Sequence, residues 1–375
     1  WGIMSLNALG RDYRSYEDIT LVIDDQFFSK VEFRTGRGDL FSQWNIAEIP
    51  RDILQNSLSS IQNGGTGEID IERFCCQATK IHDLPDGIFK GFQIQSKCSQ
   101  AIRGTKITRL KTSWFGDTLF RNLHKLKSVH AMLFRTNIET VPQDFIKESI
   151  LMEDISSLFS STPITSVPPD IFKDFSKVTK AEGVFAGSTI TTIPEDLFYD
   201  MPLVESFYRL FYRCKQIEYV GEIFKNSVNV TRTESAFQES KINTVPNTLL
   251  ENCTELVDIT MMFRSATSLV NGIDEDFLIN NTKINSLFYA FENSKCTVLP
   301  SINHLTQVTT MERAFSRYGA LSIPKDYLDG MTSLENVKYA WSTIPTIEGV
   351  IPRFWKDSTL NLTNTEGAFS YTSNA

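Results

Sequence analysis

The residues of this 375-residue chain that could carry out chemistry are six cysteines, four histidines and 45 acidic side chains. The cysteines follow no C-x-x-C spacing and no regular framework, which disfavours zinc and disulfides, so we expect mostly small, buried side chains. No H-E-x-x-H, G-x-S-x-G or G-x-x-x-x-G-K-[ST] motif organises a catalytic site. The sequence therefore predicts no enzyme, no metal site and no cofactor. A carbohydrate-active enzyme that uses two carboxylates is kept only as a remote alternative.

The histidines are scattered, and we expect structural roles for them, with His304 facing the core: His82, His124, His130 and His304.

Composition narrows the class of protein before any motif does. Apolar residues make up 41% of the chain and charged residues 22%, which is typical of a folded protein. No run approaches 18 apolar residues, so we expect no membrane insertion by this segment. The net charge of −8 disfavours nucleic acid, whose phosphates require a basic surface.

One short phrase recurs along the chain, as "TIPEDLF" at 192–198, "SVPPDIF" at 166–172 and "SIPKDYL" at 322–328. Nine of the 13 prolines fall in the same slot of this phrase. The Pro slot holds Asp24, Pro50, Pro85, Lys111, Pro142, Pro168, Pro194, Val220, Pro246, Asp274, Pro300, Pro324 and Pro352. A second slot further on, the aromatic slot, holds Phe41, Phe74, Ile102, Phe134, Phe159, Phe185, Phe211, Phe237, Phe263, Phe291, Phe315, Trp341 and Phe369.

The spacing of these two slots predicts a solenoid. The second slot follows the first by 17 residues in ten of the 13 units, and the usual return of nine gives a period of 26. We therefore expect a single solenoid of about 13 units over residues 1–375. Insertions interrupt it near 55–67 and 115–126. Because the sequence starts at Trp1 and stops just after an aromatic slot, we expect an array that is cut at both ends.

Each slot has a physical reason. Proline fits the first turn of a helix, and an acid two residues later, such as Asp196, favours the positive end of the helix dipole. Three residues after the aromatic slot lies a column of small residues, including Ser188, Cys214 and Ser240, that can hydrogen-bond the backbone of neighbouring coils. The fold class that follows is an α/β repeat solenoid in which short strands alternate with short helical turns. Apolar residues at seven, four and one before Phe263 depart from strand alternation, so the sheet is expected to be short or irregular.

The segments "FAGSTITTIPEDLF" and "FYRCKQIEYVGEIF" resemble the BspA-like variant of leucine-rich repeats. Proteins of this kind are common on the surfaces of gut and oral bacteria and occur in some of their phages. The resemblance implies a non-enzymatic, extracellular or cell-surface recognition or adhesion protein that binds a protein or glycan partner on a host or neighbouring cell. The alternative is a structural or receptor-binding component of a larger assembly, such as a phage tail fibre or surface filament, placed on the virion surface and possibly oligomeric.

A ladder of aromatic residues and arginines marks the expected binding face, because such residues are enriched in binding hot spots. It contains Tyr208, Arg209, Tyr212, Arg213, Tyr289, Arg313, Arg317 and Tyr339, accompanied by Met261, Arg264 and Phe288. The corresponding positions around Phe159 are serines, which offer little for a partner to grip. The alternative is that long side chains in register stack on one another and only cover the repeat face.

Two short motifs are weaker signals. Arg37-Gly38-Asp39 matches an integrin-binding tripeptide, but the regular 17-residue gap around it provides no extra loop to present it. N-x-[ST] sequons occur at Asn229, Asn252, Asn280 and Asn361, and they matter only for a eukaryotic source.

Overall fold

The computed structural model describes residues 23–27, 40–44, 46–56, 68–69, 71–90, 92–94, 97–115, 125–147, 149–319, 322–344 and 361–372. The chain divides into two compact units, Trp1–Val178 (unit 1) and Thr179–Ala375 (unit 2). A single array over the whole chain stays a prediction.

Regular secondary structure is sparse in the described residues, and all of it lies in unit 1. Strand β1 (Glu68–Ile69) pairs in parallel with β2 (Gln93–Ile94), with Glu68 opposite Gln93. A 3₁₀ helix, η1, covers Thr112–Phe115. Most other described residues lie in turns and isolated bridges. The predicted alternation of strands with short helical turns is therefore not confirmed.

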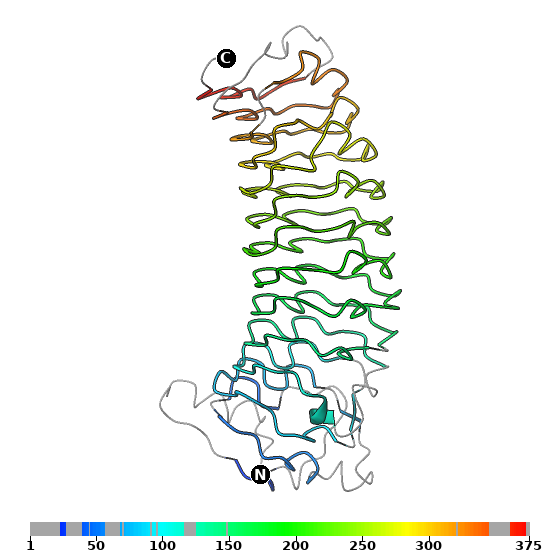
Figure 1. The fold of residues 1–375 in the computed structure, drawn as a ribbon, viewed down its shortest axis with the longest axis vertical. Helices are drawn as coiled ribbons and strands as arrows, with labels where there is room; N and C mark the ends of the chain where they lie inside the picture. Colours follow the sequence, from blue (N-terminus) through cyan, green and yellow to red (C-terminus); the bar gives the residue numbers. More distant parts are fainter. Residues whose placement is uncertain are drawn as a thin grey trace. The chain divides into compact units, whose positions relative to one another are not determined.

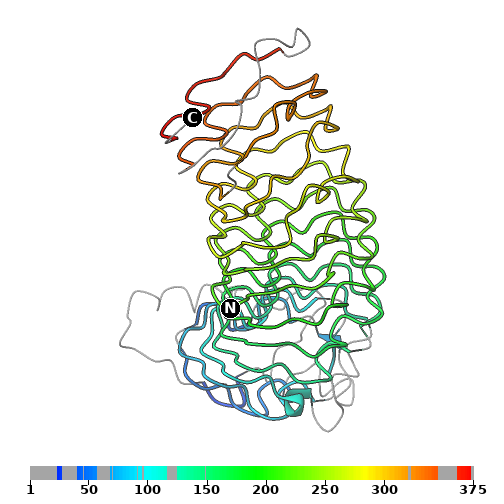
Figure 2. The ribbon, with the colours of Figure 1, turned by 45° about the horizontal axis from the view of Figure 1, so that its top comes forward.

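In unit 2, successive coils lie one over the next, from the green part of the chain to the red (Figures 1 and 2). A column of parallel bridges joins them, five residues before the aromatic slot in most coils. The bridged residues are Lys180, Ser206, Arg232, Asp258, Ser286, Thr310, Asn336 and Asn364. Many of these polar side chains also accept a hydrogen bond from the amide two residues on, as Asp258 Oδ1 does from the Thr260 amide at 2.8 Å. Such short polar side chains stabilise turns and compete with a longer strand.

A run of overlapping turns replaces the expected strand at the aromatic slot. Backbone amides alternate between two kinds of acceptor. The amide of Phe211 bonds to the next coil at Ala236 O (2.7 Å), whereas that of Tyr212 bonds back within its own coil to Arg209 O (3.2 Å). This alternation requires positive φ two residues before and after the slot, as at Arg209 (56°) and Arg213 (59°). Every second amide is thus paired between coils, and these hydrogen bonds offset the strain of the left-handed backbone.

The core of unit 2 is a column of stacked rings. Phe211 stacks on Phe185 with centroids 5.4 Å apart and on Phe237 at 5.8 Å, and Phe237 stacks on Phe263 at 5.3 Å. The same stacking continues through Phe291, Phe315, Trp341 and Phe369. Phe185 and Phe237 are fully buried, and the predicted neighbourhood of Phe185, Phe211 and Phe237 in consecutive coils is confirmed.

Two assignments of the aromatic slot in unit 1 are wrong by one residue. Positive φ falls at Arg73 and Gln77, which centres the slot on Cys75 rather than Phe74. It also falls at Ala131 and Arg135, which centres the second slot on Leu133. Leu133 is fully buried, whereas Phe134 is half-buried and lies between two guanidinium groups. The insertions before these slots remove the spacing that identifies them elsewhere, and the neighbouring aromatic residue was assigned to the slot in both cases.

The small column three residues after the slot mostly closes its own turn. The hydroxyls of Thr162 and Ser240 donate to the slot carbonyls of Phe159 (2.6 Å) and Phe237 (2.8 Å) in the same coil. Cys214 Sγ instead reaches the preceding coil, 3.0 Å from Phe185 O. The column therefore stabilises the bend largely within each coil, and the expected bond between coils is made by Cys214.

Candidate functional site

The thiols are placed as the sequence predicts. All six cysteines are free and buried. Burial raises the pKa of Cys214 and Cys253 to about 12 and that of Cys296 to about 11. The nucleophilic thiolate is therefore scarce at neutral pH, and these cysteines act as core side chains.

Three of the four histidines lie in the described part of the chain. His304 Nε2 is 3.0 Å from Leu278 O, His82 is exposed and His130 is half-buried. His124 lies outside the described residues. Within the residues searched, no group of three or more His, Cys, Asp or Glu side chains could hold a metal ion.

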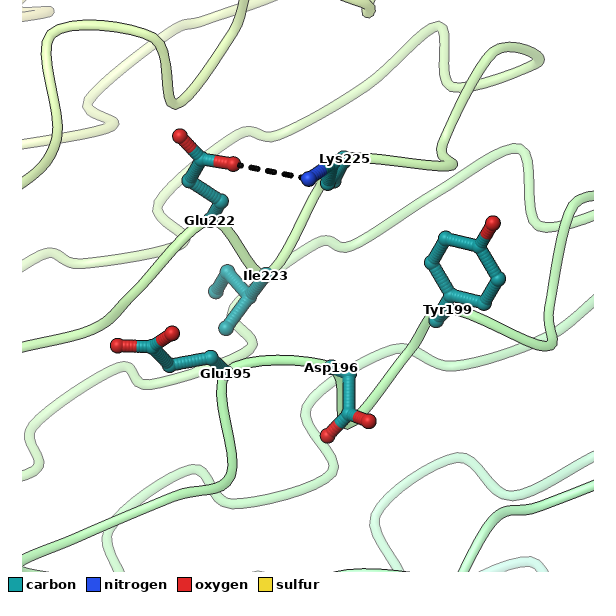
Figure 3. A pocket seen from close by; sticks show the side chains of 6 residues that line it. All are labelled: Glu195, Asp196, Tyr199, Glu222, Ile223 and Lys225. Carbon is teal, nitrogen blue, oxygen red and sulfur yellow. Dashed lines mark ion pairs between the residues drawn. The ribbon is translucent and has the colours of Figure 1, made fainter.

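Two hollows of unit 2 are lined in part by carboxylates from the turns that begin at the Pro slot. The first is about 150 Å³ and lies between two consecutive turns, lined by Glu195, Asp196, Tyr199, Glu222, Ile223 and Lys225 (Figure 3). Glu222 there pairs with Lys225 at 3.6 Å. The second is about 450 Å³ and includes Glu275, Ser301, Asn303 and Asp326. It lies beside the repeat in which the Pro slot, Pro300, and the aromatic slot, Phe315, are 15 rather than 17 residues apart.

The first hollow is smaller than the usual range for small-molecule sites, about 300–1,000 Å³, and neither provides a nucleophile with a base beside it. The recurring acids have a structural reason at the start of each turn, and we assign no catalytic role to them.

The predicted ladder is a set of alternating cation–aromatic contacts on the face of unit 2 that carries the residues flanking the aromatic slots. The first stack is Arg232–Tyr208–Arg209–Tyr212–Arg213. The Arg209 guanidinium carbon lies 4.8 Å from the ring centroid of Tyr208 and 5.1 Å from that of Tyr212. Arg232 approaches Tyr208 at 5.8 Å, and Arg213 approaches Tyr212 at 4.9 Å. Such contacts contribute about 0.5–1 kcal/mol each at exposed sites.

The second stack is Arg264–Tyr289–Arg313–Tyr339–Lys338. Arg313 lies between two rings, 5.6 Å from Tyr289 and 5.0 Å from Tyr339. Arg264 approaches Tyr289 at 5.1 Å, and Lys338 approaches Tyr339 at 5.5 Å. Both stacks therefore combine three cations with two tyrosines.

Carboxylates neutralise the ends of the first stack. Arg213 Nε pairs with Glu239 at 2.9 Å, and this hydrogen bond raises the pKa of Arg213. Arg232 pairs with Glu234 at 2.7 Å, which raises its pKa as well. The central Arg209 has no such ion pair among the described residues.

Carboxylates reach every cation of the second stack. Glu292, only 8% exposed, pairs with Arg264 at 2.7 Å and with Arg313 at 3.7 Å. Glu366 pairs with Lys338 at 2.8 Å and accepts a hydrogen bond from the Tyr339 hydroxyl at 2.8 Å. These two hydrogen bonds lower the pKa of Glu366, and the bond to Glu366 raises the pKa of Tyr339.

The predicted ladder residues fall into two exposure groups. Arg209, Arg213 and Arg317 are exposed, whereas the four tyrosines and Arg313 are half-buried. Their assignment as a ligand-binding site stays a prediction. The stacking that the alternative requires is also present, because each tyrosine of the two stacks lies against two cations.

The carboxylates that accompany the arginines were not predicted from the sequence. Glu239 lies 26 residues after Arg213, and Glu292 lies 28 residues after Arg264, which is one coil further along. Comparing charges one repeat apart could have found these pairs, because facing residues of neighbouring coils are one period apart.

The two short motifs gain little from the structure. Arg37, Gly38 and Asp39 lie outside the described residues. The four sequon asparagines are exposed, but the amide of Asn229 donates to Pro202 O (2.8 Å) and that of Asn252 to Lys225 O (3.0 Å).

Comparisons with known proteins support the fold and leave the role open. No protein-family model matches the chain, and no curated protein does. A chain in the structure of the Toll–Spatzle complex of Drosophila superposes with a TM-score of 0.52 at 13% identity over 87% of this chain and 43% of that one. A leucine-rich-repeat protein of Leptospira interrogans reaches a TM-score of 0.44 at 12% identity, covering 87% of this chain and 97% of that one.

The likeness to the Toll–Spatzle structure places this fold with the leucine-rich-repeat solenoids. At such low identity it shows the fold alone, and the chain spans less than half of the matched one. Among the residues that the structure describes, no helix is long and apolar enough to cross a bilayer.

Proposed function

We propose that this protein is a non-enzymatic recognition protein of the extracellular or cell-surface kind, which binds a protein or glycan partner through the ladder face of unit 2. The observation that carries the proposal is the pair of Arg–Tyr stacks, because Tyr and Arg are the residues most enriched in binding hot spots. The part of unit 1 around Phe159 has serines at the corresponding positions.

The architecture proposed with this function is one array over residues 1–375, with a period of about 26 residues and the BspA-like pattern of slots. The recurrence of bridges 26 residues apart, as between Ser206 and Arg232, supports that period. Fold likeness to a chain of a complex named for two proteins supports a partner-binding role by analogy only.

The proposal is tested by a binding screen of the purified chain against extracellular proteins and glycans. The variant Tyr208→Ser with Arg213→Ser should keep the fold, because other coils already carry serine there, and should lose roughly 2 kcal/mol or more of affinity per hot-spot residue. Ser157→Ala, in unit 1, is the control and should bind like the parent chain. Normal binding by the double variant would refute the ladder as the site.

A structural role in a larger assembly, such as a phage tail fibre or surface filament, is the second candidate. The stacks support this structural role because cation–aromatic contacts between coils stiffen the array. The double variant separates the two roles. Reduced stability with no partner in the screen supports the structural role, and lost affinity at unchanged stability supports recognition.

A further inference from the structure

Arg209 occupies the centre of the first stack and is the one cation there without a carboxylate among the described residues. Its guanidinium lies against the rings of Tyr208 and Tyr212, and its side chain is exposed. Ring contacts of this kind hold the planar group through its faces and leave the N–H donors in the plane for a ligand. The stack therefore presents a guanidinium that is already oriented.

Arg313 provides a matched comparison within the same unit. Both arginines lie two residues before an aromatic slot, both have left-handed backbone (φ 56° and 53°), and both contact two tyrosine rings. Arg313, however, lies 3.7 Å from Glu292, the residue that follows the slot of the preceding coil. The residue at that place in the coil before Arg209 is Ala186. One alanine in place of one glutamate distinguishes the open stack from the closed one.

We infer that Arg209 binds a carboxylate of an Asp or Glu side chain on a protein partner, an inference that rests on the proposed function and names its chemistry. A guanidinium and a carboxylate can form two parallel N–H···O bonds, which gives both strength and a defined orientation. Because the rings already orient the donor, less side-chain freedom is lost on binding.

The charges favour a single carboxylate over an anionic polymer. In the first stack Glu239 and Glu234 pair with two of the three cations, and Arg209 is the cation with no ion pair among the described residues. Glu182 and Asp258 also act electrostatically on Arg232, so the stack is not a strongly basic patch. The whole chain carries −8, which repels a polyanion over the rest of the surface. Each tyrosine ring also already contacts two guanidinium groups, which disfavours stacking of a sugar ring on it.

The experiment uses the full chain and a library of ten-residue peptides, each with one Asp or Glu, paired with the same peptides carrying Asn or Gln. Binding is followed by fluorescence anisotropy, and heparin is the polyanion arm. We expect acidic peptides that bind about tenfold or more tightly than their amide partners. Ala186→Glu, which copies the Glu292 position, should remove this preference without deleting any ladder side chain. Arg209→Gln should do the same.

Two further variants complete the design. Glu292→Gln should free Arg313 and add a second, similar acid preference. Arg135→Gln, which removes a guanidinium from the Phe134 ring in unit 1, should leave the preference unchanged. Thermal melts of each variant check that the fold is kept.

Equal binding of acidic and amide peptides, no binding of either, heparin bound in preference, or an Ala186→Glu variant that behaves like the parent would each overturn the inference. These results are distinct from failure of the proposed function. A partner that is lost with Tyr208→Ser and Arg213→Ser but retained by Ala186→Glu would keep the recognition face and dismiss the carboxylate.

Discussion

Replacing Phe237 by alanine removes a ring from the middle of the stacked column of unit 2. Phe237 is fully buried and lies between Phe211 at 5.8 Å and Phe263 at 5.3 Å, with Phe224 at 6.3 Å. Truncation of a buried phenylalanine costs about 3–5 kcal/mol through lost burial and the cavity that remains. Since two stacked neighbours lose their partner and the coils above and below are held by the backbone ladder, the cavity cannot collapse easily. We therefore expect the upper half of that range.

Urea unfolding followed by circular dichroism measures this change as a fall in the midpoint at constant slope. Phe237→Leu, which keeps most of the volume, serves as the control and should cost well under half as much. Both variants should retain the far-UV spectrum of the parent, because the hydrogen bonds between coils use main-chain atoms. A cost below about 1 kcal/mol for the alanine variant would place Phe237 outside the packed core and refute the ring column.

Three further predictions concern the slot register, the backbone and the thiols. Leu133→Ala should destabilise by about 2–5 kcal/mol and Phe134→Ala by clearly less, and the reverse order in urea unfolding would restore Phe134 to the slot. Gly187 has φ 69°, so Gly187→Ala should cost about 1 kcal/mol in the same assay, whereas a gain would show that alanine fits there without strain. Burial raises the pKa of Cys214 and Cys253 to about 12, above that of an unfolded thiol. Their contribution to the free energy of unfolding should therefore be fully present below about pH 9 and should be lost as pH rises toward 12. Iodoacetamide should accordingly leave these thiols unlabelled at pH 8 until the chain is unfolded, and rapid native labelling would contradict their burial.

Much of the repeat could be predicted because it depends on residue type at a fixed spacing. The Phe column from Phe185 to Phe369 and the small residues after it follow from packing one side chain per coil. The prediction was wrong at Phe74 and Phe134, where insertions remove the spacing and only the backbone conformation distinguishes adjacent apolar residues. Similarly, the polar residue five before the slot was not interpreted, although it caps an amide in many coils.

The sequence by itself determined that side chains recur in register and that arginines and tyrosines gather near Phe211 and beyond. Only the tertiary structure decided which backbone each coil adopts, since the choice between a strand and a run of turns depends on amides paired with the neighbouring coil. It also decided which cations are paired. Glu292 and Ala186 hold equivalent places in their coils, but their effect on Arg313 and Arg209 arises across the space between coils. Ion pairing depends on distances of a few ångströms between residues a full repeat apart, and these distances exist only once the coils have stacked.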